Sequence, residues 1–271
     1  MKIIDCITYC GEDLLLKIRF ETLFDKVDKF VIVEANKFFN GEPKPKYFDI
    51  NKFEKYKKKI DFYYIENLPK FNGDNLQYEN FIKDQIKLGL KNLDDEDIIL
   101  ISDVDEIPNL KKFDFKKIED YVFAFSQTHS MYKFNLLRKD NWIGTKLCKK
   151  KILKSPQWLR SLKVKKKYSF FRIDKYFSKT YYKKFKIIDD GGWHFGWLMN
   201  LSQILEKINS YAHTEHNIPK FKNKSYIEDC IDKNVSFLDL NDKLTLKEEI
   251  SFLPNYIQKN KEKFSLWIKK R

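Results

Sequence analysis

Short apolar runs alternate with longer amphipathic stretches through the first part of the chain. Apolar runs of strand length predict buried β-strands at Ile3–Tyr9, Phe30–Val33, Ile60–Ile65 and Asp97–Ile101. Apolar residues at helical spacing predict helices between them, one after Glu12 that carries Leu16, Phe20, Leu23, Phe24 and Val27, and one after Asp74 or Asn75 that carries Ile82, Ile86, Leu90 and Leu93. This order predicts an α/β fold in which helices flank a mainly parallel, Rossmann-type sheet.

The rest of the chain has a less regular pattern. Further strands are expected at Tyr121–Thr128, Met131–Leu137 and Val164–Ile173. A helix is expected over Leu201–Ala212, and the tail beyond Tyr226 should form helical pieces that Pro254 interrupts. Because the sequence has no internal repeat and no clear linker, a single domain over residues 1–271 is the simplest organisation.

Composition places the chain among basic globular proteins. Hydrophobic residues make up 42%, and the 53 Lys and Arg exceed the 39 Asp and Glu to give a formal charge of +14. A positive charge of this size attracts polyanions, but Lys-rich solvated faces would produce the same excess. The charge therefore supports an anionic ligand without establishing one.

The cysteines and the N-terminus indicate the compartment. Cys6, Cys10, Cys148 and Cys230 form no C-x-x-C pair and no zinc-ligand spacing, as expected of free thiols in a reducing compartment. Asp5 interrupts the N-terminal apolar run too early for the apolar region of a signal peptide. No window of the sequence has the roughly 18 apolar residues of a membrane span. We expect a cytoplasmic protein that touches membranes at most peripherally, through its Lys-rich faces.

The run after Asp97–Ile101 contains the most informative chemistry. It continues as Ser102-Asp103-Val104-Asp105-Glu106-Ile107-Pro108, which places acids at the carboxyl end of a strand, where ligands bind in such sheets. Carboxylates at this spacing can hold a divalent cation that stabilises the charge of a leaving diphosphate. Acids at strand ends also cap helices or solvate loops. Glycine-rich dinucleotide and P-loop motifs are missing from the sequence.

A second motif is the glycine- and tryptophan-rich run from Gly191 to Trp197. His194 could complete the coordination of a metal at Asp103 and Asp105. Trp193 and Trp197 could stack on a sugar or a base, and the glycines would let backbone approach a ligand. The alternative is an aromatic core turn with one hydrogen-bonded histidine.

Together these segments resemble glycosyltransferase family 17, which contains β-1,4-mannosyl-glycoprotein 4-β-N-acetylglucosaminyltransferases. The run from Asp97 to Pro108 is the specific part of the resemblance. Weaker similarity extends over Glu12–Leu23 with Arg19, Val31–Glu34, Gly41–Phe48, Gln77–Leu90 with Asn80, Gly191–Trp197 and Lys207–Glu215. The family usually has an arginine directly before the residue that Asn80 matches, where this chain has Glu79.

The resemblance implies a GT-A-like fold, a UDP-sugar donor, Mn²⁺ or Mg²⁺, and inversion at the anomeric carbon. The transferred sugar would be N-acetylglucosamine, and the acceptor a glycan or another hydroxyl compound. Residues 1–110 would bind the nucleotide sugar, 111–216 would form a mixed metal and acceptor half, and 217–271 a helical tail. Asp103, Asp105 and His194 would hold the metal, and no nucleic acid partner is expected.

Direct displacement needs a base that takes the acceptor proton, and several acids are candidates. They are Glu106, Asp189, Asp190 and Glu215, among which the sequence does not choose. Arg160 could contact the diphosphate and Glu34 the nucleotide, although a solvated arginine and an exposed strand-end acid are the plainer alternatives.

Other classes of function also fit part of the pattern. A metal-dependent phosphohydrolase or nuclease uses acids at strand ends too, but it would need more ligands than His194. A basic nucleic-acid-binding protein would use the positive charge and would give Asp103 and Asp105 no role.

Overall fold

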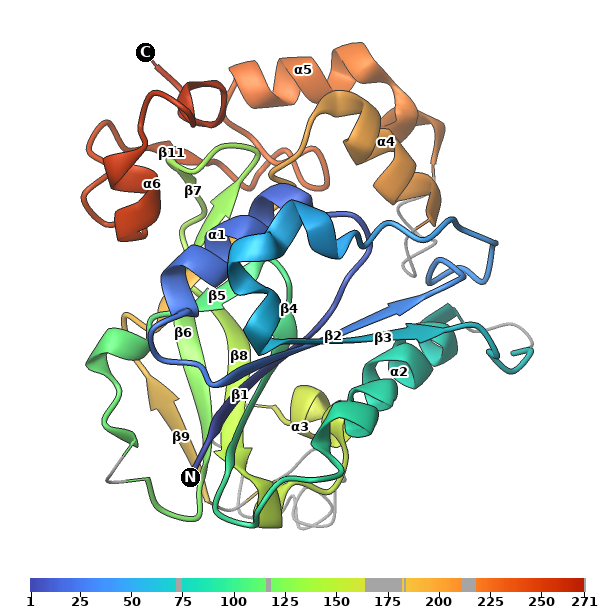
Figure 1. Ribbon diagram of the computed structural model, residues 1–271. Coiled ribbons are helices and arrows are strands. Elements are labelled where there is room, and N and C mark those ends of the chain that lie inside the picture. Colours follow the sequence, from blue (N-terminus) through green and yellow to red (C-terminus); the bar gives the residue numbers. More distant parts are fainter. Residues whose placement is uncertain (72–74, 116–117, 164–181, 183, 211–217, 271) are drawn as a thin grey trace, which may run out of the picture.

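In the described part of the chain, a computed structural model shows a mixed sheet of eleven strands with helices on both faces (Figure 1). The structure describes residues 1–71, 75–115, 118–163, 182, 184–210 and 218–270. The strands are β1 Ile3–Thr8, β2 Lys29–Ala35, β3 Ile60–Ile65, β4 Ile98–Asp103, β5 Glu106–Pro108, β6 Val122–Met131, β7 Leu136–Leu137, β8 Trp142–Lys149, β9 Phe185–Ile188, β10 Gly192–Gly196 and β11 Thr245–Leu246. The α-helices are α1 Asp13–Leu23, α2 Asn75–Asp84, α3 Pro156–Ser161, α4 Leu201–Ser210, α5 Lys224–Asp232 and α6 Asn255–Lys259.

The parallel part of the sheet confirms the strands expected in the first part of the chain. β1 lies between β2 and β4 and pairs with both in parallel, and β3 continues the parallel order at the edge beyond β2. All four strands therefore end at one edge of the sheet, where Thr8 of β1 is in register with Asp103 of β4. The acidic run leaves the sheet at this edge.

The prediction of a mainly parallel sheet holds for β1 to β4, but the sheet as a whole is mixed, and its antiparallel strand β8 was not foreseen. β8 lies between β4 and β6 and is antiparallel to both. The chain returns from the end of β6 at Met131 to the start of β8 at Trp142 over a short connection, and a parallel return would need a longer crossover. The period-two order of Ile143, Thr145 and Leu147 is typical of a strand and could have indicated β8.

Each face of the sheet contributes to its own core. Alternate residues of β1, β2 and β4 meet α1 and the 3₁₀ helix η1 (Ile50–Lys59) on one face, together with α6. The intervening residues meet α2 and α3 on the other face. Figure 1 shows α2 and α3 on the opposite side of these strands from α1. Helices on both faces, as expected, leave the strand ends as the open edge.

Both helices of the first part are shorter than their apolar stripes. α1 ends at Leu23, so Phe24 and Val27 lie beyond it, although Val27 is still buried. α2 ends at Asp84 and continues as the 3₁₀ helix η2 (Gln85–Leu90). Gly89 of η2 lies so close to β2 that an added Cβ would be 2.5 Å from Val31. This close approach requires glycine at that position.

The later elements form a smaller core at one end of the molecule. Figure 1 shows α4, α5 and α6 near β7 and β11 at this end. α4 and α5 pack around Met131, Phe221 and Phe237. α4 and the pieces after Tyr226 agree in type with the expected helices, and β6 and β7 pair as predicted. The strand expected at Val164–Ile173 falls outside the described residues, as do 211 and 212 of the helix expected over Leu201–Ala212. Within the described part of the chain, every helix is too short or too polar to span a membrane.

Candidate active site

The acidic run turns sharply where β4 ends. Asp103 is the last residue of β4, Val104 and Asp105 form the turn, and Glu106 begins β5. The hydrophobic strand Ile98–Ile101 is fully buried between its neighbours, so it positions the turn rigidly at the edge of the sheet. Three carboxylates consequently leave one short segment in different directions.

A β-ladder joins the two motifs. β5 pairs antiparallel with β10, which places His194 directly opposite Glu106, and the amide of Phe195 donates to the Asp105 carbonyl at 2.9 Å. The motif around His194 is therefore a strand, where the sequence suggested a turn. Gly192 has φ +128°, and an added Cβ would be 2.2 Å from the Ile107 carbonyl oxygen. Because Gly192 has no side chain, the backbone of β5 can pack against it, whereas we had expected the glycines of this motif to make room for a ligand.

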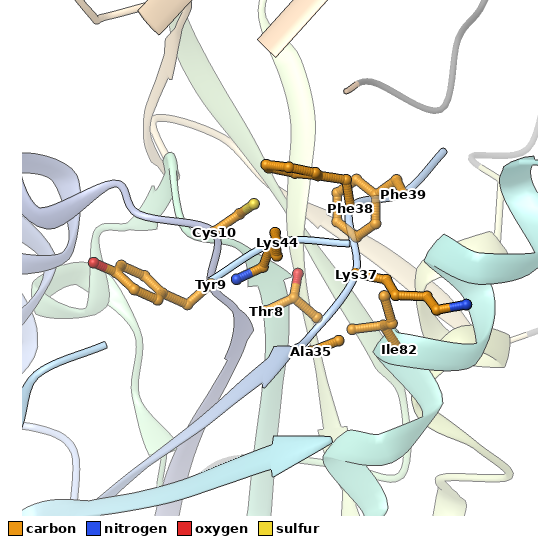
Figure 2. Close-up of a pocket in the computed structure, with 9 residues that line it drawn as sticks. All are labelled: Thr8, Tyr9, Cys10, Ala35, Lys37, Phe38, Phe39, Lys44 and Ile82. Atoms are coloured by element: carbon orange, nitrogen blue, oxygen red, sulfur yellow. The ribbon is translucent and has the colours of Figure 1, made fainter. Parts of the chain in front are cut away.

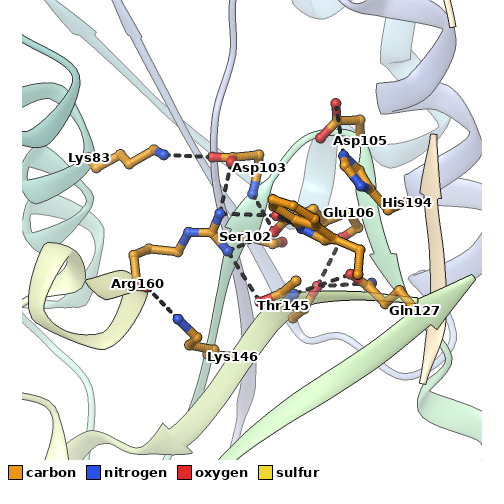
Figure 3. Close-up of polar contacts among 12 residues, drawn as sticks. Lys83, Ser102, Asp103, Asp105, Glu106, Gln127, Thr145, Lys146, Arg160 and His194 are labelled. Carbon is orange, nitrogen blue, oxygen red and sulfur yellow. Dashed lines mark hydrogen bonds and ion pairs between the residues drawn. The ribbon is translucent and has the colours of Figure 1, made fainter. Parts of the chain in front are cut away.

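Asp103 forms ion pairs through both carboxylate oxygens. Oδ1 lies 3.0 Å from Nζ of Lys83 on α2, and Oδ2 accepts from Nη2 of Arg160 on α3 at 2.8 Å. Figure 3 shows both cations on the same side of Asp103. Burial acts to raise the pKa of Asp103, but Arg160 and Lys83 outweigh it and hold that pKa well below its usual range.

Lys83 is in turn held by Glu79, whose Oε1 lies 2.6 Å from its Nζ. Glu79 is the residue that departs from the family's usual arginine. Because Lys83 pairs with both acids, the helix before the acidic motif delivers a positive charge to Asp103. Lys83 had not been singled out in the sequence.

Asp105 has a different partner. Its Oδ2 lies 3.7 Å from Nε2 of His194, and the Asp105 side chain is 14% exposed (Figure 3). Burial acts to raise the pKa of Asp105, but His194 and Lys207 outweigh it and lower that pKa. Nδ1 of His194 is buried and has no hydrogen-bond partner among the described residues. The pair is thus closely spaced, with one oxygen of Asp105 left for another ligand.

Both carboxylate oxygens of Glu106 accept hydrogen bonds from the protein. Oε1 accepts from Nε1 of Trp142 at 2.7 Å and from Arg160 at 3.0 Å, while Oε2 accepts from Arg160 at 2.7 Å and from the Asp103 amide at 3.1 Å. The residue is 1% exposed. A base needs a lone pair that faces its substrate, so this geometry favours a positioning role for Glu106. Its assignment as the base stays a prediction.

Arg19 is hydrogen-bonded to residues on both sides of the acidic turn. It is fully buried on α1 and donates from Nε and Nη2 to the two carboxylate oxygens of Asp5 at 2.6 and 2.5 Å. It also donates to Ser102 Oγ and to the backbone carbonyls of Asp103 and Glu106, at 2.5, 3.3 and 2.8 Å. One guanidinium therefore holds both ends of the acidic turn.

Two aromatic residues of this site were missed in the sequence. The ring of His129 on β6 stacks on His194 at 4.4 Å between centroids, and the ring of Trp142 lies 4.9 Å from His194. Burial, and then the nearby His194, lower the pKa of His129 to about 3, so it is neutral at ordinary pH. His129 lies between the strands expected at Tyr121–Thr128 and Met131–Leu137, and a lone histidine there offered no signal for this role.

A small hollow lies beside the acids, at the ends of β1 and β2 (Figure 2). Its lining includes polar groups and aromatic rings, from Thr8, Tyr9, Cys10, Ala35, Lys37, Phe38, Phe39, Lys44 and Ile82. Because Thr8 pairs with Asp103, the hollow and the acidic turn are neighbours along the sheet edge. This hollow also was not predicted.

Two residues predicted to bind the donor lie in buried structural positions. Glu34 is fully buried, and it accepts from the Lys44 ammonium and from the amides of Tyr47 and Phe48. Trp193 is 9% exposed and donates from Nε1 to the Phe252 carbonyl at 2.7 Å. Glu34 thus organises the loop beside the hollow, and Trp193 packs in the core. Arg160, by contrast, lies at the acidic turn, and its contact with a diphosphate stays a prediction.

Two of the remaining candidate bases, Asp189 and Asp190, lie in the described part of the chain. Asp189 and Asp190 form an exposed turn before β10, in which Asp190 has φ +48°. Glu215 lies outside the described residues. Among the residues that the structure describes, no group of three or more His, Cys, Asp or Glu side chains surrounds a common metal position. Of the predicted metal ligands, Asp105 and His194 form a close pair, whereas Asp103 faces Lys83 and Arg160.

In α/β proteins, ligands bind beyond the carboxyl ends of the parallel strands. This chain has acids and a hollow at that edge, which is typical of an α/β protein that binds a small ligand there. Residues 1–148 match the model of glycosyltransferase family 17, and the chain belongs to that family.

Curated relatives agree with this assignment. The human β-1,4-mannosyl-glycoprotein 4-β-N-acetylglucosaminyltransferase is 31% identical over 146 residues, which cover 49% of this chain and 27% of that protein. The mouse protein of the same name is 25% identical over 229 residues, which cover 77% and 42%. The chain thus spans less than half the length of these relatives.

Solved structures resemble the chain only weakly. HddC from Yersinia pseudotuberculosis, in complex with GMP-PN, has a TM-score of 0.33 and 12% identity, and the match covers 70% of this chain and 90% of HddC. A glycosyltransferase that acts on the major capsid of PBCV-1 has a TM-score of 0.31 and 13% identity over 70% of this chain and 82% of its own. The galactosyltransferase LgtC has a TM-score of 0.28 and 13% identity over 56% and 59%.

Proposed function

We propose that this chain is a metal-dependent inverting glycosyltransferase with a GT-A-like fold that transfers a sugar from a UDP-sugar donor to a hydroxyl acceptor. The observation that carries the proposal is the pairing of β5 with β10, which brings His194 to within 3.7 Å of Asp105 at the end of a central strand. Family membership favours this function over a phosphohydrolase or a nucleic-acid-binding protein.

The donor atoms suit a divalent cation. A carboxylate oxygen and an imidazole nitrogen 3.7 Å apart are at a distance that two ligands of one ion can have, since each binds at roughly 2.1 Å. Mg²⁺ and similar ions commonly take one or two protein ligands and complete their shell with water and substrate phosphates. Asp105 and His194 would hold the ion, which would stabilise the negative charge of the leaving diphosphate. In this arrangement Asp103 is not a ligand.

Asp103, Lys83 and Arg160 supply a second element of recognition. The two cations surround one carboxylate at the end of β4, next to the place proposed for the diphosphate. Charge-assisted contacts from lysine and arginine can orient phosphate groups. Lys83 and Arg160 would thus attract the diphosphate while Asp103 keeps them in position.

We place the nucleoside at the edge of the sheet where the small hollow lies, at the ends of β1 and β2. Phe38 and Phe39 are among the residues that line this hollow, and Glu34 organises the adjoining loop. Aromatic walls with a few polar groups are typical of sites for small molecules that contain a base. The curated relatives are named as N-acetylglucosaminyltransferases, so UDP-N-acetylglucosamine is the first donor to test. The acceptor would be a glycan or glycoconjugate, and its proton would pass to one of the acids Asp189, Asp190 or Glu215.

Slow donor hydrolysis tests the proposal without an acceptor. Purified protein would be incubated with a panel of UDP-sugars, with Mn²⁺, with Mg²⁺ or with a chelator, and UDP release would be measured. We expect hydrolysis of at least one UDP-sugar, and its loss in the chelator. The substitution His194→Ala should lower the rate at least tenfold, because it removes one of the two proposed metal ligands.

His213→Ala is a useful control, since it removes another histidine from the chain. This variant should leave the metal dependence of the rate unchanged. If neither UDP nor any UDP-sugar binds the wild-type protein in the presence of Mn²⁺, as measured by calorimetry, the proposal is wrong.

A further inference from the structure

Trp142 is an exposed aromatic side chain that buried groups hold in one orientation. It is 41% exposed, whereas most apolar residues of β8 are buried. Its indole nitrogen donates to the carboxylate of the buried Glu106 at 2.7 Å. The same carboxylate is held by Arg160, so a buried and already paired acid fixes the edge of the exposed ring. The arrangement indicates that the orientation of this ring matters.

A glycine on the same strand leaves space for the ring of Trp142. Gly144 follows two residues later on β8, and an added Cβ there would be 2.9 Å from Cδ1 of Trp142 and 1.9 Å from Oε1 of Gln127. The ring lies 4.9 Å from that of His194 and 5.6 Å from that of His129, between centroids. Trp142 is therefore seated against the same histidine that pairs with Asp105.

The sheet order places Trp142 on the far side of the acids from the hollow. The relevant strands follow one another as β2, β1, β4 and β8. The hollow lies at β2 and β1, the acids end β4, and Trp142 begins β8 at the same edge because β8 is antiparallel to β4. With roughly 4.8 Å between strands, β1 and β8 are about 10 Å apart. A nucleotide sugar has its parts in the same order, as nucleoside, diphosphate and sugar.

We propose that Trp142 is the platform on which the pyranose ring of the donor stacks, with the diphosphate at Asp105 and His194. This inference rests on the proposed function and adds the sugar subsite to it. The apolar C–H face of a pyranose complements the negative face of an aromatic ring. Glu106 fixes the edge of the indole, so the ring presents a pre-oriented surface beside the diphosphate position. Trp142 is a binding residue for the sugar, and Glu106 positions it.

Comparing UDP with a UDP-sugar isolates the contribution of the sugar. The affinities of wild-type protein and of Trp142→Ala for UDP and for UDP-N-acetylglucosamine would be measured by calorimetry with Mn²⁺, together with the rate of donor hydrolysis. We expect Trp142→Ala to weaken the UDP-sugar complex roughly tenfold and to change UDP affinity less than about twofold. Trp142→Phe keeps a ring and should recover most of the affinity for the UDP-sugar.

Leu240→Ala is the matched control, because Leu240 is 49% exposed and lies in the distant C-terminal part of the chain. It should change neither affinity. Thermal melting would verify that each variant is folded, and Trp142→Leu, which removes the aromatic ring but keeps apolar bulk, carries the test if Trp142→Ala is not.

The outcomes separate the platform from the overall function. Equal loss of UDP and UDP-sugar affinity in Trp142→Ala would overturn the platform, since it would show a general disturbance of the diphosphate site. Unchanged affinity for both ligands would overturn it as well. Absence of UDP binding by the wild-type protein would instead remove the proposed function, and the platform with it.

Discussion

Asp103 and Asp105 are two residues apart, yet their surroundings differ sharply. Asp103 faces the ammonium of Lys83 and the guanidinium of Arg160, while Asp105 faces the imidazole of His194. The pKa of each carboxyl is lowered against the effect of burial, but by different partners. The reason is the turn at Val104, after which the chain reverses into β5.

The comparison assigns different tasks to the two acids. The charge of Asp103 is already balanced by protein cations, so a divalent ion would compete with Lys83 and Arg160 for it. Asp105 has one imidazole, which is itself a metal ligand when neutral. Two acids at this spacing therefore need not bind one ion together. Asp105 is the one we expect a metal to use.

The largest effect should come from removing Arg19, the support that both acids share. Arg19→Met leaves the buried Asp5 without its partner and releases the carbonyls of Asp103 and Glu106. We expect a loss of about 3–5 kcal/mol in the free energy of unfolding, measured by urea denaturation.

The double variant Asp5→Leu/Arg19→Met should recover part of this loss, because it leaves no unpaired buried charge. Lys52→Met breaks only the exposed pair with Asp13 and should cost under about 1 kcal/mol. Equal effects of Arg19→Met and Lys52→Met would show that Arg19 does not support the turn.

The next effect separates the two acids directly. Asp105→Asn should reduce Mn²⁺-dependent donor hydrolysis by about 100-fold or more, because it removes a proposed metal ligand. Asp105→Asn should also raise the Mn²⁺ concentration that gives half the maximal rate. Asp103→Asn should raise that concentration much less than Asp105→Asn does, since Asp103 acts through Lys83 and Arg160. The measurement is a Mn²⁺ titration of the hydrolysis rate for each variant. If the two variants shift the Mn²⁺ dependence equally, Asp103 and Asp105 share the ion and the comparison fails.

The smallest effect concerns stability in acid. The folded pKa of Asp103 lies below its ordinary value of 3.8, so its ion pairs stabilise the fold above about pH 4 and are lost as pH falls below that value. Asp103→Asn should therefore flatten the fall of unfolding free energy below pH 4. The difference in slope should stay below about 1.4 kcal/mol per pH unit, since a side chain that is 37% exposed is partly screened.

Asp13→Asn is the control for this measurement, because its carboxylate pairs on the surface with Lys52. Unfolding by urea at several pH values between 2 and 6 would give the slopes. A slope in Asp103→Asn identical to that of the wild-type protein would mean that Lys83 and Arg160 do not lower the pKa of Asp103.

Much of the fold could be predicted because its signals are local. β1, β2, β3 and β4 are apolar runs of strand length, and such runs are buried almost regardless of context. β8 was missed because Lys146 and Gly144 interrupt its apolar pattern. Both interruptions depend on distant residues. The Lys146 ammonium donates to the carbonyls of Arg160 and Leu162, and Gly144 gives space to Gln127 and Trp142.

By itself, the sequence determined the acidic run, the strand that delivers it and the histidine motif that accompanies it. These are contiguous segments whose order follows from local pattern. Only the tertiary structure decided that Asp103 faces Lys83 and Arg160, that Asp105 faces His194, and that Trp142 lies beside them. These partners are separated along the chain and meet through strand register and helix packing, which side-chain spacing in the sequence does not specify.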